Sequence, residues 1–259
     1  MLLVDVHTHL DHPDFDDLDK VIEAAKKVGV KAIVTNGVNN TSNRKVLELA
    51  KKYDIVKAAL GIYPIEALQN EVKQGQYPRT SGPFDIDEEI EFIEKNKNNI
   101  AAIGEVGLDF KNTNEVETQT KLFGRFIELS EKLRKPIIVH SRKAEGMVVD
   151  MLNSSSNKKI ILHCFCGKKR FVKKAIDAGW FFSIPTNVVK SQQFQELVGM
   201  APMSQLFTET DAPYLAPYPN MRNEPAFIVE SIKKIATIKK MEQQEVANII
   251  YNNYQRIFE

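Results

Sequence analysis

Near its start the chain carries the stretch VDVHTHLDH, residues 4–12. Its two valines are β-branched and favour a short strand. Residues two apart on a strand project from the same face, so we expect His7 and His9 to point the same way. Two imidazole rings presented side by side form half of a metal site. His12 follows in the loop beyond the strand and is a weaker candidate ligand.

Length and charge limit the class of protein. The chain has 259 residues, of which 43% are hydrophobic, enough for a sizeable core. We expect one domain over residues 1–259, because a single α/β barrel commonly reaches this length. The formal net charge is +1. No global positive field therefore attracts nucleic acid, and any such binding must come from a local patch.

The cysteines and the N-terminus indicate the compartment. Cys164 and Cys166 are the only cysteines and lie too close for an ordinary disulfide framework, which fits a reducing environment. Without a second cysteine pair they are also a poor zinc site. The N-terminus has neither a basic start nor a long apolar run. We expect a soluble cytoplasmic protein with no membrane segment, and nothing indicates an obligate protein partner.

Strand and helix patterns alternate along the chain. After the first strand, strands are predicted at 32–35, 55–60, 100–104, 137–139, 160–162, 181–184 and 206–208. Helices are predicted at 18–28, 42–53, 85–96, 115–133, 147–152, 169–178, 192–198, 224–238 and 243–258. Such alternation implies parallel strands joined by right-handed crossovers. The sequence therefore predicts a single (β/α)8 TIM barrel with extra C-terminal helices.

Residues 63–84 interrupt the alternation with several glycines and prolines and mixed charges. This insertion follows the third strand, so in a barrel it lies over the catalytic face. A lid or substrate wall and a tolerated surface insertion are both consistent with it.

Potential metal ligands follow five of the eight predicted strands. Because parallel barrel strands end on one rim, these side chains should converge there. Each has a structural alternative: His140 as a capping or hydrogen-bonded core histidine, Glu105 as a partner of Arg142, and Asp211 as the N-cap of a turn. Four of the five histidines fall at strand ends, which favours a shared site. The candidate ligands are His7, His9, Glu105, His140, His163 and Asp211.

Six ligands exceed what one catalytic ion needs, so we expect two divalent ions, Zn²⁺, Mn²⁺ or Mg²⁺. Two such ions can share a bridging carboxylate and activate water for hydrolysis. Glu105, near the middle of the order, is the bridging candidate. His7, His9 and Asp211 would complete one shell. His140 and His163 would complete the other, and Asp211 would also accept the proton of the attacking water.

Six motifs resemble the TatD family of metal-dependent deoxyribonucleases. They are HTHLD (7–11), GEVGLDF (104–110), PIIVHSR (136–142), HCFCG (163–167), ETDAPYL (209–215) and RNEP (222–225). The resemblance implies a TIM-barrel metallohydrolase that cleaves DNA phosphodiester bonds, often as a 3′→5′ exonuclease. By position, it places the family's metal ligands on the same six residues.

Two positions depart from the family's pattern, and others are candidates for substrate contact. Tyr63 stands where the family commonly has His, and Cys166 where it commonly has Ser. Arg142 and Arg222 lie inside family motifs and are candidates to bind substrate phosphates. Tyr214 is a candidate to stack against a base, with buried packing as the alternative.

Three functions fit these features. The leading hypothesis is a hydrolase that cleaves DNA, with single strands or 3′ ends as substrate, and with Glu105 and Asp211 as catalytic residues. The alternative is a barrel metallohydrolase acting on an amide, a lactone or a phosphotriester. Many such enzymes bridge their metals with a carbamylated lysine at strand four, where this chain has Glu105. A barrel that binds metal or nucleic acid without catalysis is the third, which the complete ligand set disfavours.

Overall fold

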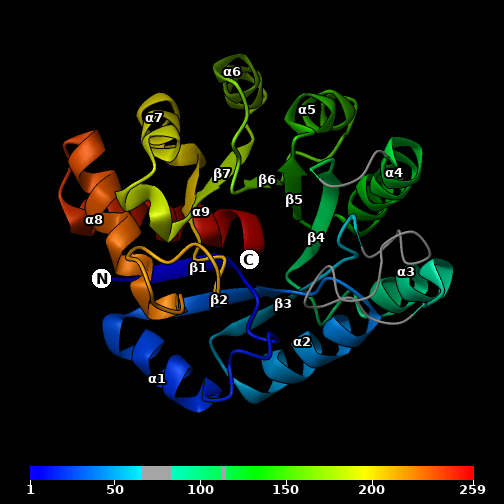
Figure 1. Ribbon diagram of the computed structural model, residues 1–259, viewed down its shortest axis with the longest axis horizontal. Helices are drawn as coiled ribbons and strands as arrows, with labels where there is room; N and C mark the ends of the chain where they lie inside the picture. The colour runs from blue at the N-terminus through cyan, green and yellow to red at the C-terminus, as the bar shows by residue number, and fades with distance from the viewer. Residues whose placement is uncertain (66–82, 112–114) are drawn as a thin grey trace.

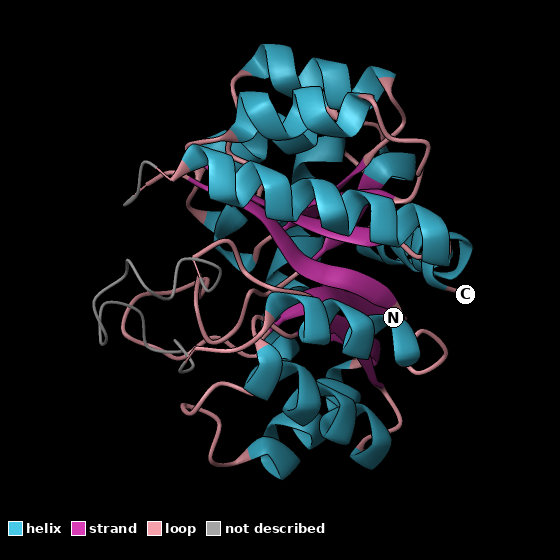
Figure 2. Cartoon of the chain, turned by 90° about the vertical axis from the view of Figure 1, so that its right-hand side faces the viewer, coloured by secondary structure: helices cyan, strands magenta, loops and turns pink. Residues whose placement is uncertain are grey.

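The computed structural model describes residues 1–65, 83–111 and 115–259. Most of the predicted insertion at 63–84 lies outside the described residues. Eight parallel strands form one sheet in the order β1 to β8, and helices surround them (Figures 1 and 2). The strands are β1 Leu3–Thr8, β2 Val30–Asn36, β3 Val56–Leu60, β4 Ala102–Asp109, β5 Ile137–Arg142, β6 Ile160–His163, β7 Phe181–Ile184 and β8 Leu206–Thr208.

The sheet curls into a nearly closed barrel, and a few bonds join its first and last strands. Thr208 Oγ1 donates to the carbonyl of Val4 at 2.7 Å. Beyond the end of β8, Asp211 N–H donates to the carbonyl of His7, and His9 N–H donates to the carbonyl of Ala212, both at 2.9 Å. The predicted (β/α)8 barrel is therefore confirmed, and the start of the chain is held against the segment that carries Asp211.

Most of the helices form the outer layer of the barrel, and α9 lies across the middle of this view (Figure 1). The helices are α1 Leu18–Val28, α2 Asn40–Lys52, α3 Ile86–Lys95, α4 Val116–Leu133, α5 Glu145–Asn153, α6 Lys169–Asp177, α7 Gln192–Met200, α8 Ile228–Lys239 and α9 Gln243–Phe258. The two C-terminal helices are present as predicted. Asn253 on α9 donates to the carbonyl of Leu206 at 2.9 Å, so α9 packs at the amino end of β8, opposite the carboxyl ends of the strands. No helix in the described ranges is long and apolar enough to cross a bilayer.

The strands are built mainly of Val, Ile, Leu, Ala and Phe, because a parallel sheet is covered on both faces. Every residue of β1 and of β4 is buried. Polar side chains interrupt this core toward the carboxyl ends of the strands, where the candidate ligands lie.

Some element boundaries differ from those predicted. β4 continues past Glu105, and β5 continues past His140, so both side chains project from within a strand. The N-cap of α2 is Asn39, whose side chain accepts a hydrogen bond from Ser42 N–H at 2.9 Å. Ser42 Oγ donates to Asp11. Residues 224–227 do not begin α8, because Pro225–Phe227 form a 3-10 turn before it.

Candidate metal centre

The structure brings all six predicted ligands together at the carboxyl ends of the strands. Glu105 is central, and its carboxylate is buried, with 3% of the side chain exposed. The other five surround it on two sides, and His140 and Asp211 are the more accessible members, at 13% and 15% side-chain exposure.

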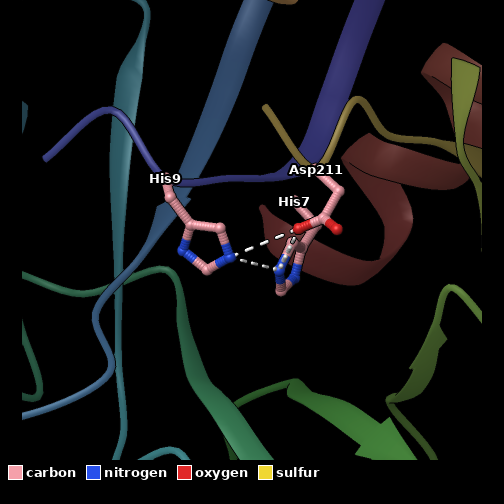
Figure 3. A group of neighbouring side chains, drawn as sticks. All are labelled: His7, His9 and Asp211. Carbon is pink, nitrogen blue, oxygen red and sulfur yellow. Dashed lines mark hydrogen bonds and ion pairs between the residues drawn. The ribbon is translucent and has the colours of Figure 1, made fainter. Parts of the chain in front are cut away.

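The first cluster contains His7, His9, Asp211 and one oxygen of Glu105. The two Nε2 atoms of His7 and His9 are 3.3 Å apart, and Figure 3 shows both rings turned toward the Asp211 carboxylate. Asp211 Oδ1 lies 3.6 Å from His7 Nε2 and 3.3 Å from His9 Nε2. Glu105 Oε2 lies 3.6 and 3.4 Å from the same two nitrogens.

These spacings fit one shared cation. Ligand atoms about 2.1 Å from a tetrahedral ion are about 3.4 Å from one another. In the first cluster the two histidine Nε2 atoms are 3.3 Å apart, and each lies 3.3–3.6 Å from the Asp211 and Glu105 oxygens. Two imidazole nitrogens and two carboxylate oxygens also form a donor set that Zn²⁺ and Mn²⁺ accept.

The second cluster uses the other oxygen of Glu105 with His140 and His163. Glu105 Oε1 lies 3.0 Å from His140 Nδ1 and 3.5 Å from His163 Nε2. His140 Nδ1 is buried and faces this carboxylate oxygen. A buried imidazole nitrogen beside a carboxylate oxygen suits a bound cation.

The carboxylates and two of the histidines are held in the forms that bind metals. Burial raises the pKa of Glu105, but His7 and a hydrogen bond from His140 outweigh burial and hold that pKa well below its usual range. Burial likewise opposes ionisation of Asp211, but a hydrogen bond from His9 lowers its pKa overall. Burial lowers the pKa of both His7 and His163, so these rings are neutral. Carboxylates and neutral imidazoles are the ligand forms.

His140 differs from the other histidines. Burial lowers its pKa, but hydrogen bonds with Asp109 and Glu105 outweigh burial and raise the pKa to about 9. In the metal-free protein this ring therefore carries a proton at neutral pH. A cation at this cluster must displace that proton.

Sequence reasoning did not identify two further carboxylates at the site. Asp109 Oδ2 lies 3.3 Å from His140 Nε2, and Glu209 Oε2 lies 3.0 Å from His163 Nδ1. Burial raises the pKa of Glu209 to about 8. Both residues sit in motifs already noted, GEVGLDF and ETDAPYL. Their presence in these motifs is their only signal in the sequence. Neither was among the ligand candidates chosen at the strand ends.

A cavity of about 530 Å³ opens beside the two clusters, and some of the residues predicted to contact substrate line it. Arg142, which is exposed, and Tyr214 both line it. The Tyr214 hydroxyl lies 3.1 Å from Nε2 of the buried His12, which stands outside both ligand clusters. Tyr63 and Cys166 also lie on the cavity wall.

Arg222 occupies a different place. Its guanidinium pairs with Asp17 at 2.8 Å, donates to the carbonyl of Asp14 at 2.6 Å and stacks over the Phe15 ring. It is absent from the described residues that line the cavity. In this structure Arg222 therefore joins the β8–α8 segment to the β1–α1 segment.

A parallel barrel whose mouth gathers four histidines with acidic side chains around one buried carboxylate belongs to the class of metal-dependent hydrolases. Comparison with known proteins agrees. The chain belongs to the TatD-related DNase family, whose model matches residues 4–259. The family resemblance seen in the six sequence motifs is thereby confirmed.

Relatives and solved structures cover nearly the whole chain. Human deoxyribonuclease TATDN3 is 36% identical over 99% of this chain and 94% of its own length. An uncharacterized metal-dependent hydrolase of Methanocaldococcus jannaschii is also 36% identical, over 98% and 96%. The crystal structure of YJJV, a TatD homologue of Escherichia coli K12, shares the fold, with a TM-score of 0.86 at 21% identity over 99% and 97% of the two chains.

Proposed function

We propose that this metal-dependent hydrolase cleaves DNA phosphodiester bonds at a two-metal site, removing nucleotides from 3′ ends. The observation that carries the proposal is the placement of Glu105. One of its oxygens faces the nitrogens of His7 and His9, and the other faces those of His140 and His163. One carboxylate with a histidine pair on each side is the arrangement that a bridged pair of cations requires.

The ligands divide accordingly between two ions. His7, His9 and Asp211 would hold the first ion, His140 and His163 would hold the second, and Glu105 would offer one oxygen to each. Bound divalent ions would supply Lewis acidity and lower the pKa of water at the site. The nitrogen-rich donor set favours Zn²⁺ or Mn²⁺ over Mg²⁺.

Asp211 and Glu105 have separate tasks. Asp211 is ionised and lies at the cavity, so it is placed to take up the proton of an attacking water. Glu105 also borders the cavity, but both of its oxygens are engaged with histidines, so it holds the site together instead of transferring protons.

Several observations support DNA and its ends as the substrate. Human TATDN3, which is similar to this chain over 94% of its own length, is named a deoxyribonuclease. A cavity of about 530 Å³ suits one small-molecule-sized unit such as a terminal nucleotide. Arg142 at its wall can pair with a phosphate, and Tyr214, 41% exposed, can stack on a base of a single strand.

Two broader expectations belong to this proposal. Nearly all buried hydrophobic side chains among the described residues join one core cluster, which supports a single domain. Both cysteines are free thiols, which supports a reducing location such as the cytoplasm.

The test is digestion of single-stranded oligonucleotides labelled at the 3′ or the 5′ end. Wild type and Glu105→Ala are stripped of metal and resupplied with Mg²⁺, Mn²⁺ or Zn²⁺. Glu89→Ala is the matched control, because Glu89 is as buried as Glu105 but bonds to Asn43 and Arg44, away from the clusters.

We expect metal-dependent loss of the 3′ label first in wild type and in the control, and no cleavage by Glu105→Ala. A protein that binds metal but cleaves no oligonucleotide with any ion would contradict the DNA assignment. Amide and lactone substrates would then be tested.

A further inference from the structure

The second cluster has a feature that the proposed function does not use. Each of its histidines has one ring nitrogen facing Glu105 and the other facing a second carboxylate. The nitrogen that faces Glu105 is Nδ1 in His140 and Nε2 in His163. We propose that Asp109 and Glu209 are positioning residues that make His140 bind through Nδ1 and His163 through Nε2. This inference rests on the proposed metal-ligand roles and adds the groups that orient two of the ligands.

Glu209 holds His163 from a fully buried position. Its Oε2 lies 3.0 Å from His163 Nδ1 and also accepts from the Ser183 hydroxyl. Its Oε1 accepts from Cys164 N–H at 3.0 Å. In its ionised form Glu209 accepts hydrogen bonds but does not donate them, so with Glu209 ionised the ring proton belongs on Nδ1. The lone pair of Nε2 then faces Glu105 Oε1, 3.5 Å away.

Asp109 holds His140 from the opposite ring nitrogen. Its Oδ2 lies 3.3 Å from His140 Nε2, which leaves Nδ1 facing Glu105 Oε1 at 3.0 Å. Asp109 is itself fixed. Oδ1 accepts from Lys111 N–H at 2.9 Å, and the buried amide of Gln119 bonds both the N–H and the carbonyl of Asp109.

Tyr63 contacts both Asp109 and His140. Its hydroxyl donates to Asp109 Oδ2 at 2.7 Å and lies 3.3 Å from His140 Nε2, and its ring packs against that of His140 with centroids 4.8 Å apart. The hydroxyl therefore fixes the orientation of the carboxylate that orients the histidine. Tyr63 is thus a third positioning residue, acting on His140 through Asp109.

Removing one of these carboxylates should lower the affinity for metal by a measurable amount. A carboxylate behind a metal-binding histidine fixes the tautomer and raises the basicity of the ligating nitrogen, and its loss lowers metal affinity about 10–100-fold. Removing the Tyr63 hydroxyl leaves both carboxylates in place. We expect that change to lower the affinity by less than either carboxylate change.

The first experiment reads the ligating nitrogens directly. Nitrogen-15 NMR of histidine-labelled protein, free of DNA and titrated with Zn²⁺, assigns for each ring which nitrogen binds zinc and which keeps its proton. We expect zinc on Nδ1 of His140 and on Nε2 of His163. Binding of both through the same nitrogen would overturn the inference. Absence of a zinc-dependent shift at both rings would instead refute the proposed metal site.

The second experiment measures zinc affinity by calorimetry for Asp109→Asn, Glu209→Gln and Tyr63→Phe. Glu89→Gln is the matched control, since it neutralises a buried carboxylate that touches no histidine among the described residues. We expect a loss of about 10–100-fold for the two carboxylate variants and none for the control. Affinities equal to wild type in both carboxylate variants would overturn the inference, whether or not the protein cleaves DNA.

Discussion

Substitution of Gly107 by Ala tests how strongly the geometry of the site depends on close contact between β4 and β5. Gly107 has a φ of +145°, a backbone conformation that residues with a Cβ rarely adopt. It pairs with His140 in the register of the two strands. A Cβ placed on Gly107 would stand 2.0 Å from the carbonyl oxygen of His140 and 2.9 Å from its carbonyl carbon.

The expected cost has two parts. Holding a residue other than glycine in this backbone region costs about 1–3 kcal/mol. Forcing a methyl group into a closely packed contact costs about 1–3 kcal/mol more, and here the neighbour is backbone and cannot rotate away. Gly107→Ala should therefore lower the free energy of unfolding by about 2–6 kcal/mol. It should also weaken metal binding, because β5 must move and carries His140 with it.

The assay is urea unfolding followed by circular dichroism, in EDTA so that metal binding does not contribute to the free energy of unfolding. Gly124→Ala is the control, because a Cβ at this position of α4 meets no atom of the described structure within 4 Å. That change should stabilise the protein by about 0.5–1 kcal/mol through helix propensity. A Gly107→Ala protein within about 0.5 kcal/mol of wild type would refute the reasoning.

Three further predictions concern metal, pH and substrate. Removing metal with EDTA should lower the melting temperature, and an ion resupplied at about 100 times its Kd should restore about 2.7 kcal/mol per site; an unchanged melting curve would contradict the metal site. In EDTA, unfolding free energy should fall as pH rises from 6.5 to 8, because the pKa values of His140 (about 9) and Glu209 (about 8) are raised above their ordinary values, so the native state binds more protons than the unfolded state. Urea midpoints that rise over this range would be inconsistent with those shifts. Arg142→Ala should raise the KM for oligonucleotides about tenfold and weaken the dependence of KM on salt. Arg222→Ala should leave KM unchanged, because the Arg222 guanidinium is paired with Asp17 outside the cavity. Steady-state kinetics at several salt concentrations distinguishes the two variants.

The sequence by itself determined the barrel and most of its elements. The predicted ranges of α1, α9 and β7 coincide with the observed ones, and eight strands occur where eight were expected. This success has a local cause, since strand and helix patterns and turn residues are properties of neighbouring positions. The convergence of the six ligands also followed from sequence, because all parallel strands of a barrel end on one rim.

Only the tertiary structure decided how those side chains face one another. Sequence order made Glu105 a bridging candidate, but the division of its two oxygens between two histidine pairs depends on strand curvature and register. The same holds for Asp109 and Glu209, which support histidines from other strands, and for Arg222, which a family motif suggested for phosphate but which pairs with Asp17. Spacing along one chain specifies which face of an element a residue occupies. It does not specify which atom of a distant residue lies within 3 to 4 Å, because that distance depends on the packing of all the elements between them.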